Sequence, residues 1–230
     1  MRQAPVHLQY ETGGQSEFCL SFGAASSGRA ILIVPPLFDE MNRTQRMLVE
    51  AMRMLAGKGV CTLLPDLPGC NESMADVAAQ NLQSWNEAMT AATGQLGATH
   101  IASIRGGVLI DGGITLPHWR LAPAKGASIL KTMLRARMAA DKEAGRASSM
   151  ESLLADAQKG PLELAGYLLS PDMLFSLEHS EAAPLEAARE VALGEIGGSA
   201  LWLRAEPDDD AAMSASIAED LDRWSASCGG

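Results

Sequence analysis

The chain has 230 residues and a formal net charge of −10, from 18 basic and 28 acidic side chains. This length suits one domain of moderate size with a substantial hydrophobic core. The basic residues are scattered, without the stripe that phosphate backbones require, so nucleic acid is not an expected partner.

Cysteine spacing and hydropathy exclude further classes. Cys19, Cys61, Cys70 and Cys228 form no CxxC pair, so neither a zinc site nor a local disulfide framework is expected. The first residues contain no apolar leader core, and no run reaches the roughly 18 apolar residues of a membrane span. The sequence therefore predicts a cytoplasmic protein with reduced thiols, no membrane span, no metal and no cofactor.

The predicted strands fall into two kinds. Residues 6–10 and 17–22 alternate polar with apolar side chains around Thr12-Gly13-Gly14, which predicts an antiparallel hairpin. Short runs that are apolar on both faces predict strands at the centre of a parallel sheet. These runs are residues 30–35, 60–65, 100–104 and 200–205, and residues 116–123 are a weaker further candidate.

Helical spacing of apolar residues recurs between these runs. It covers residues 40–56 and 81–96, and returns in residues 213–224. Alternating strands and helices of this length predict a doubly wound α/β fold with a mostly parallel sheet. Residues 125–190 break the alternation and predict a mainly helical cap over the carboxyl ends of the strands. We expect one domain, residues 1–230, that includes this cap.

The segment SIRGG has the form of a nucleophile elbow. Its strand, residues 100–104, is followed by a turn, and a helix is expected from Val108, which is the setting of the G-x-S-x-G motif. Small residues occupy three places, Ser103, Gly106 and Gly107, but Arg105 stands where the nucleophile belongs. A guanidinium stays protonated and has no lone pair with which to attack a carbonyl. Arg105 therefore cannot be a nucleophile.

Two other side chains are alternative nucleophiles. Ser103 lies two residues earlier, beneath the turn rather than at its tip. Cys70 follows a parallel strand at the ligand-facing end of the sheet, but a thiol needs a base to activate it. In hydrolases of this chain order the histidine comes last, and no residue after Asp210 can act as that base. The four histidines are His7, His100, His118 and His179, and none is placed to act as the catalytic base.

Four segments carry a family resemblance: PPLFDEMNRTQRM (35–47), LLPDLPGCNES (63–73), SIRGG (103–107) and GPLELAGYLLSPDM (160–173). With them the chain resembles the α/β-hydrolase fold and, more narrowly, the exosortase A system-associated hydrolases of the second type. The resemblance implies a bacterial protein from exosortase and exopolysaccharide loci, and that family itself carries arginine at the elbow. It also implies an α/β-hydrolase-like sheet shortened at the C-terminus, without the segment that usually carries the catalytic histidine.

The resemblance places further residues around the former catalytic pocket. Asp39 and Glu40 follow the third strand, in the loop that helps to form the oxyanion hole in active relatives. In one interpretation they pair with Arg105. In the other they are acids of a helix N-terminus, where the helix dipole stabilises negative charge. Asp66 is expected to bond its own loop. The full predicted pocket is Leu37, Phe38, Asp39, Glu40, Asn42, Asp66, Cys70 and Arg105; Asn42 either adds to its mouth or caps a helix. Asp208 to Asp210 are read as a solvated turn rather than a metal site, and all four tryptophans as packing.

Three functional hypotheses remain open. The first is a degenerate hydrolase that acts as a binding or accessory protein, with Arg105 offered to a small anionic or acyl ligand. The second is a genuine hydrolase of esters or thioesters with a non-standard site. The third is a structural partner that forms a homodimer, or a heterodimer with a serine-bearing paralogous hydrolase, through its cap. The first is favoured because a fold does not confer its chemistry once the site is gone.

Overall fold

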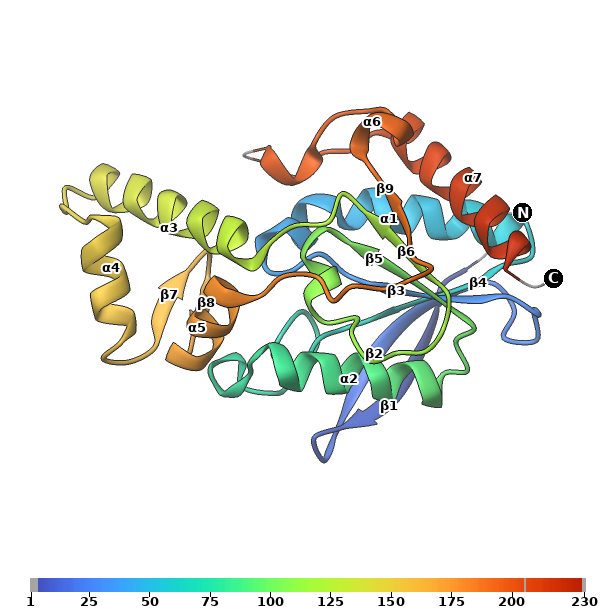
Figure 1. Cartoon of the computed structure of the whole chain (residues 1–230), viewed down its shortest axis with the longest axis horizontal. Coiled ribbons are helices and arrows are strands. Elements are labelled where there is room, and N and C mark those ends of the chain that lie inside the picture. The colour runs from blue at the N-terminus through green and yellow to red at the C-terminus, as the bar shows by residue number, and fades with distance from the viewer. Residues whose placement is uncertain (1–3, 205, 229–230) are drawn as a thin grey trace.

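The structure is a computed structural model that describes residues 4–204 and 206–228. Its centre is a seven-stranded sheet in the order β1-β2-β4-β3-β5-β6-β9 (Figure 1). β2 pairs antiparallel with β1 and with β4, and all other neighbours are parallel. This arrangement confirms the predicted mostly parallel α/β fold. The strands are β1 (Val6–Thr12), β2 (Gln15–Phe22), β3 (Ala30–Val34), β4 (Cys61–Pro65), β5 (His100–Ile104), β6 (His118–Leu121) and β9 (Arg189–Val191).

The N-terminal hairpin lies at one edge of the sheet, as predicted. Its turn is formed by Gly13 and Gly14, both with positive φ (57° and 77°), the conformation that two-residue hairpin turns require. The other edge is the three-residue strand β9. His118 to Leu121, the weaker strand candidate, lies inside the sheet between β5 and β9.

Helices cover both faces of the sheet (Figure 1). α2 (Leu82–Gln95) lies on one face, and α1 (Asp39–Gly57) and α7 (Ala211–Ser227) lie on the other. Alternate residues of β3 supply the two cores: Leu32 packs with the α2 layer, and Ile31 with the α1 and α7 layer. Such strands are apolar on both faces because both are buried. No helix in the described part of the chain has the length and apolar character of a bilayer span.

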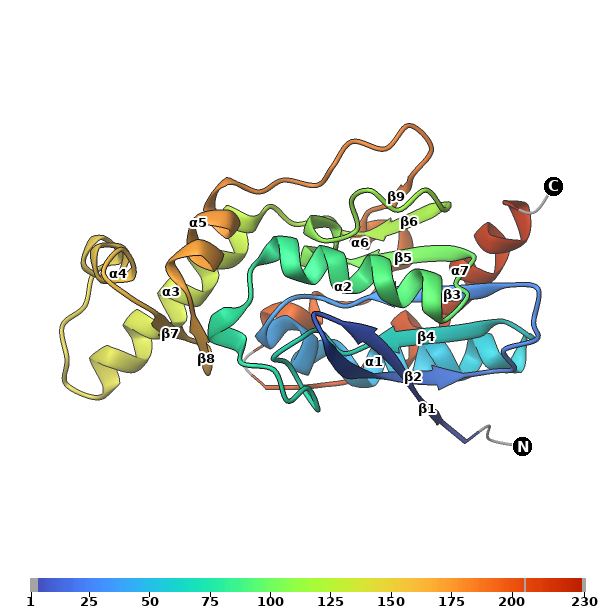
Figure 2. The same cartoon turned by 90° about the horizontal axis from the view of Figure 1, so that it is seen from below.

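The segment from Lys125 to His179 leaves the sheet and lies beyond the carboxyl ends of the parallel strands (Figure 2). It also contains a two-stranded sheet, and the coil after it returns to the core as β9. The predicted cap range, 125–190, therefore overlaps the first residues of that strand. The elements are α3 (Gly126–Glu143), α4 (Met150–Ala157), β7 (Leu162–Leu164), β8 (Tyr167–Leu169) and α5 (Pro171–His179).

One strand prediction was wrong. Residues 200–205 were expected at the centre of the sheet, but Leu201–Leu203 form a 3₁₀ turn (η3) outside it, and Ala205 lies outside the described residues. Leu201 and Trp202 instead pack in the α1 core layer. A short apolar run buries equally well as a strand or as a packed turn, so periodicity alone does not distinguish them. The remaining short elements are η1 (Val77–Ala79), η2 (Arg105–Leu109) and α6 (Leu193–Ile196).

A buried carboxylate fastens α7 to the sheet. Asp220 accepts hydrogen bonds from Trp119 Nε1 on β6 at 2.8 Å, from Arg189 of β9 at 2.9 Å through both Nε and Nη2, and from Arg223 at 2.7 Å. Burial raises the pKa of Asp220, but the bonds from Arg189, Trp119 and Arg223 outweigh it and lower this pKa to about 2. The charged form is therefore the one that the fold stabilises.

We expect Asp220→Asn to lower the free energy of unfolding at neutral pH by about 2 kcal/mol, the stability equivalent of this pKa shift. Because the folded pKa lies below the unfolded one, the contribution is present above about pH 4 and is lost as the pH falls toward 2. Urea unfolding of both proteins between pH 7 and pH 2 measures the difference. A gap that stayed constant over this range would contradict the assignment.

Candidate functional site

Arg105 occupies the tip of the turn that follows β5. Its φ is +54°, a left-handed conformation that costs a non-glycine residue on the order of 1–3 kcal/mol and concentrates at functional turns. The next residues must be small. A Cβ on Gly107 would lie 2.6 Å from the carbonyl oxygen of Val34, at the end of β3, and one on Gly106 would lie 2.5 Å from a methyl carbon of Ile129. The backbone of the elbow is thus preserved while its central residue is an arginine.

The helix expected after the elbow does not form. Only the 3₁₀ turn η2 (Arg105–Leu109) follows, and the chain then enters a loop that leads to β6. Asn86 on α2 holds this loop by donating to the carbonyls of Ile110 at 2.9 Å and Gly112 at 2.8 Å. Asp111 is fully buried there, where it meets side chains of β5 and β6. These contacts replace the longer helix.

The Arg105 side chain turns back against the core. Its Nε and Nη2 each donate to a different oxygen of Glu40 at 3.2 Å, and Nη1 donates to the carbonyl of Ala122 at 3.0 Å. The guanidinium carbon lies 4.5 Å from the centre of the Trp202 ring, a cation–π contact. Arg105 is therefore held by groups from α1, from the end of β6 and from η3.

The two acids that follow β3 behave differently. Glu40 is only 6% exposed and forms the two-point ion pair with Arg105, whereas Asp39 pairs with Arg43 one turn along α1, at 2.7 Å. Burial raises the pKa of Glu40, and the attraction of Arg105 opposes that shift. The structure thus brings one of the two predicted acids to the elbow and leaves the other on the helix.

Aromatic side chains fill the space between the start of α1, the loop after β4 and the cap. Phe38 is buried, with its ring centre 5.3 Å from that of Trp85 and 5.5 Å from that of Tyr167 in the cap strand β8. The cavity left between Phe38, Cys70 and Tyr167 is about 10 Å³. One water molecule needs roughly that much space. This hollow has no room for a substrate. A separate, open hollow of about 400 Å³ is lined by Arg105 itself, together with Ala122 and Glu190.

The other predicted pocket residues have local roles. Leu37 is fully buried beside Gly106, and Asn42 lies exposed on α1. Asp66 accepts bonds from Asn71 at 2.8 Å and from the amide of Glu72 at 3.4 Å, both within its own loop.

The remaining acids and tryptophans hold the fold together. Asp208 pairs with Arg204, Asp209 pairs with Arg46, and Asp210 caps α7. All four tryptophans are buried: Trp85, Trp119, Trp202 and Trp224.

Cys70 is poorly suited to nucleophilic attack. It is buried, and burial raises the pKa of its thiol to about 12, with further contributions from the nearby carboxylates of Asp66 and Glu17. A nucleophilic cysteine needs the opposite, a positive environment and a lowered pKa. At neutral pH this side chain is a protonated thiol.

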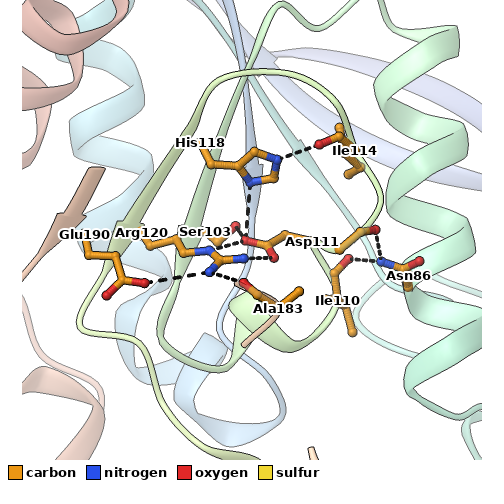
Figure 3. Close-up of polar contacts among 10 residues, drawn as sticks. Asn86, Ser103, Ile110, Asp111, Ile114, His118, Arg120, Ala183 and Glu190 are labelled. Atoms are coloured by element: carbon orange, nitrogen blue, oxygen red, sulfur yellow. Dashed lines mark hydrogen bonds and ion pairs between the residues drawn. The ribbon is translucent and has the colours of Figure 1, made fainter. Parts of the chain in front are cut away.

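Ser103 belongs to a buried polar cluster that the sequence analysis did not anticipate (Figure 3). Its hydroxyl donates to Asp111 Oδ2 at 2.7 Å. Arg120 donates to the two oxygens of Asp111 at 2.9 and 2.7 Å. His118 Nε2 donates to the carbonyl of Ile114 at 2.9 Å, and its Nδ1 lies 3.5 Å from Asp111. Burial raises the pKa of Asp111, but the nearby His118 ring and the hydrogen bonds from Arg120 and Ser103 outweigh it and hold that pKa below its ordinary value.

This cluster contains a serine, a histidine and an aspartate in an order that does not suit acyl transfer. In a catalytic triad the histidine lies between the serine and the acid, so that it can take the hydroxyl proton. Here the carboxylate of Asp111 lies between Ser103 and His118, and Ser103 is completely buried (Figure 3). The arrangement is that of a structural ion-pair network. In the sequence HWRL, His118 and Arg120 share one face of a strand, and this polar i, i+2 pair in a buried run was the available signal.

The other three histidines lie away from the elbow. His7 is on the edge strand β1, and His100 begins β5 at its amino end, where its ring packs edge-on against Trp224. His179 ends α5 and stacks on Phe175. All four histidines fall within the described residues, and none forms a hydrogen bond with Ser103, Cys70 or Arg105. In the described part of the chain the elbow therefore has no histidine base beside it.

Comparison with known proteins yields only distant structural likenesses. No family model and no curated protein match the chain. A protein from Agrobacterium vitis S4 described as a hydrolase is 15% identical, with a TM-score of 0.49, over 98% of this chain and 99% of its own. An esterase from Pyrococcus furiosus is 10% identical (TM-score 0.45; 58% of this chain, 56% of its own). An epoxide hydrolase from Vigna radiata is 14% identical (TM-score 0.42; 51% of this chain). The chain spans only 40% of that enzyme.

The class of protein follows from the topology itself. A mostly parallel sheet, an antiparallel N-terminal hairpin and a left-handed residue at the turn after β5 define an α/β-hydrolase-like fold. Its elbow carries an ion-paired arginine, and the hollow between Phe38, Cys70 and Tyr167 is nearly filled.

The Arg105–Glu40 pair is expected to stabilise the fold. Removing one partner of a buried ion pair leaves an uncompensated charge and costs about 3–5 kcal/mol, and slightly less here because Arg105 is partly exposed. We therefore expect Glu40→Ala to lower the free energy of unfolding by about 2–4 kcal/mol. The double variant Arg105→Met with Glu40→Leu should lower the free energy of unfolding by less than Glu40→Ala alone, because it leaves no uncompensated charge. Chemical unfolding of the variants tests this; additive losses would show that the two side chains are not coupled.

Thiol chemistry gives a second test of the closed site. We expect Cys228, which is exposed, to react readily with iodoacetamide at pH 8, whereas Cys70 reacts only after unfolding because it is buried and protonated. Mass spectrometry of peptides from the native protein and from the Cys228→Ser variant measures this. Fast modification of Cys70 in the native protein would show that the hollow opens.

Proposed function

We propose that this chain is a degenerate α/β-hydrolase-fold protein that has no serine-hydrolase turnover and acts as a binding or accessory protein. The observation that carries the proposal is the state of Arg105. It stands at the nucleophile position in a left-handed backbone conformation, and its guanidinium is ion-paired with Glu40. The position that would attack a substrate is occupied by a cation that a neighbouring acid already neutralises.

The surroundings of the elbow support the same conclusion. Acyl transfer by this fold needs a nucleophile, a base in contact with it and a hollow for the acyl group. Ser103 donates to Asp111 and is buried, the Cys70 thiol is protonated, and the hollow between Phe38, Cys70 and Tyr167 is about 10 Å³. Both alternative nucleophiles therefore fail for a physical reason, and the hollow beside Cys70 is too small for an acyl group.

The mode of binding follows from the same contacts. Three of the hydrogen bonds that Arg105 can donate go to Glu40 and Ala122, and the acid cancels its charge. This supports binding through another surface of the molecule over capture of a small anion at the elbow. The four sequence segments that resemble the exosortase A system-associated hydrolases place the protein, in our proposal, with a bacterial exosortase and exopolysaccharide system in the cytoplasm.

The purified chain is expected to hydrolyse p-nitrophenyl esters and acyl thioesters at background rates, without saturation, and to resist labelling by a fluorophosphonate. Arg105→Ser alone should not restore turnover, because in the described part of the chain no histidine lies beside the elbow to take the hydroxyl proton. A serine esterase assayed in parallel serves as the positive control. Saturable hydrolysis that Ser103→Ala or Cys70→Ala abolishes would sink the proposal, and turnover by Arg105→Ser would do so as well.

A further inference from the structure

A groove runs between two helices of the segment beyond the strand ends. Its walls are α4 and α5, and its volume is about 410 Å³. Leu154 and Ala157 line it from α4, and Pro171, Leu174 and Phe175 from α5. Figure 1 shows these helices at the end of the molecule that lies farthest from the two termini. The groove is therefore separate from the elbow and from the contacts that stabilise it.

Phe175 is the most unusual residue of this groove. It is 66% exposed, although it lies in a helix whose neighbouring residues Met173, Leu174 and Leu177 are buried. Its ring centre lies 4.3 Å from that of His179. A large apolar side chain exposed at the rim of an apolar groove is the usual mark of a surface that a partner covers.

The charges around the groove are of one sign. Its charged lining residues are Asp172 and Glu178, both exposed. Within the residues that the structure describes, neither carboxylate forms an ion pair, whereas nearby acids do: Asp156 pairs with Lys159 and Glu181 with Lys125. The chain as a whole carries a net charge of −10. The groove is thus complementary to an apolar surface bordered by positive charge, and it repels an acidic one.

We propose that this groove binds an amphipathic helix of a partner protein whose apolar face is bordered by lysine or arginine. A helix laid between α4 and α5 would place apolar side chains at i, i+3, i+4 and i+7 against Leu154, Leu174 and Phe175. Its basic residues would then meet Asp172 and Glu178. The proposal rests on the non-catalytic role proposed above, and the ester assay tests that role independently of any binding.

A synthetic pair of helical peptides tests this chemistry on the full chain. One peptide has leucine on one face and lysine on the other, and the second replaces every lysine by glutamate. Fluorescence anisotropy should show binding of the Leu–Lys peptide only. Phe175→Ser should weaken it about tenfold or more, as loss of an aromatic anchor does. Because Phe175 is exposed, this variant should fold normally, which its melting temperature checks.

Matched charge variants distinguish binding in the groove from non-specific electrostatic attraction of a basic peptide to an acidic protein. Asp172→Asn with Glu178→Gln should weaken the Leu–Lys peptide severalfold, whereas Glu87→Gln with Glu219→Gln removes the same charge from α2 and α7 and should leave binding unchanged. Equal losses in the two double variants, or no effect of Phe175→Ser, would overturn the proposal. So would Phe175-dependent self-association in light scattering, since the occupant would then be a second copy of the chain. Failure of peptide binding with background ester hydrolysis refutes only the groove; true turnover with intact binding refutes only the non-catalytic role.

Discussion

The two-point ion pair between Arg105 and Glu40 is the constraint on which this site depends. It joins the turn after β5 to the first turn of α1, and the same guanidinium reaches the end of β6 through Ala122 and stacks on Trp202. A left-handed residue at this turn would otherwise be a source of strain. Groups from α1, from the end of β6 and from η3 thus converge on one partly buried cation, and the elbow connects these segments.

A second buried charge organises the other side of β5. Asp111 accepts hydrogen bonds from Ser103 and Arg120 and lies 3.5 Å from His118 Nδ1. Arg120 also donates to the carbonyl of Ala183 at 2.8 Å, in the coil that leads to β9 (Figure 3). The helix that would follow the elbow is replaced by a loop held by this network and by Asn86 of α2. Burying one arginine and one aspartate is tolerable only because their polar atoms find such partners. Residues that suggest a triad by type thus serve to connect the sheet to its last strand.

These two networks show how charged side chains can serve the packing of a hydrolase-like fold. Turnover depends on a free nucleophile, a base and a hollow, whereas the fold depends on close packing and on paired charges. In this chain the side chains at the elbow meet the second set of demands. The binding role that we propose is assigned to surfaces away from the elbow, and the groove between α4 and α5 is the one we propose, because it exposes Phe175 and its acids form no ion pair within the described residues.

The sequence by itself determined the fold class. The two-sided apolar runs, the hairpin around Gly13-Gly14 and the helical patterns of α1, α2 and α7 are local signals, and SIRGG excluded a serine at the elbow. Tertiary structure alone decided which acid meets Arg105, because Asp39 and Glu40 are adjacent and only their directions on α1 separate them. It also placed residues 201–203 outside the sheet, because a short apolar run can be buried either in a strand or against a helix. The Ser103–Asp111–His118–Arg120 cluster likewise depends on how β5, β6 and their connecting loop meet, and such long-range pairing leaves little trace in local sequence.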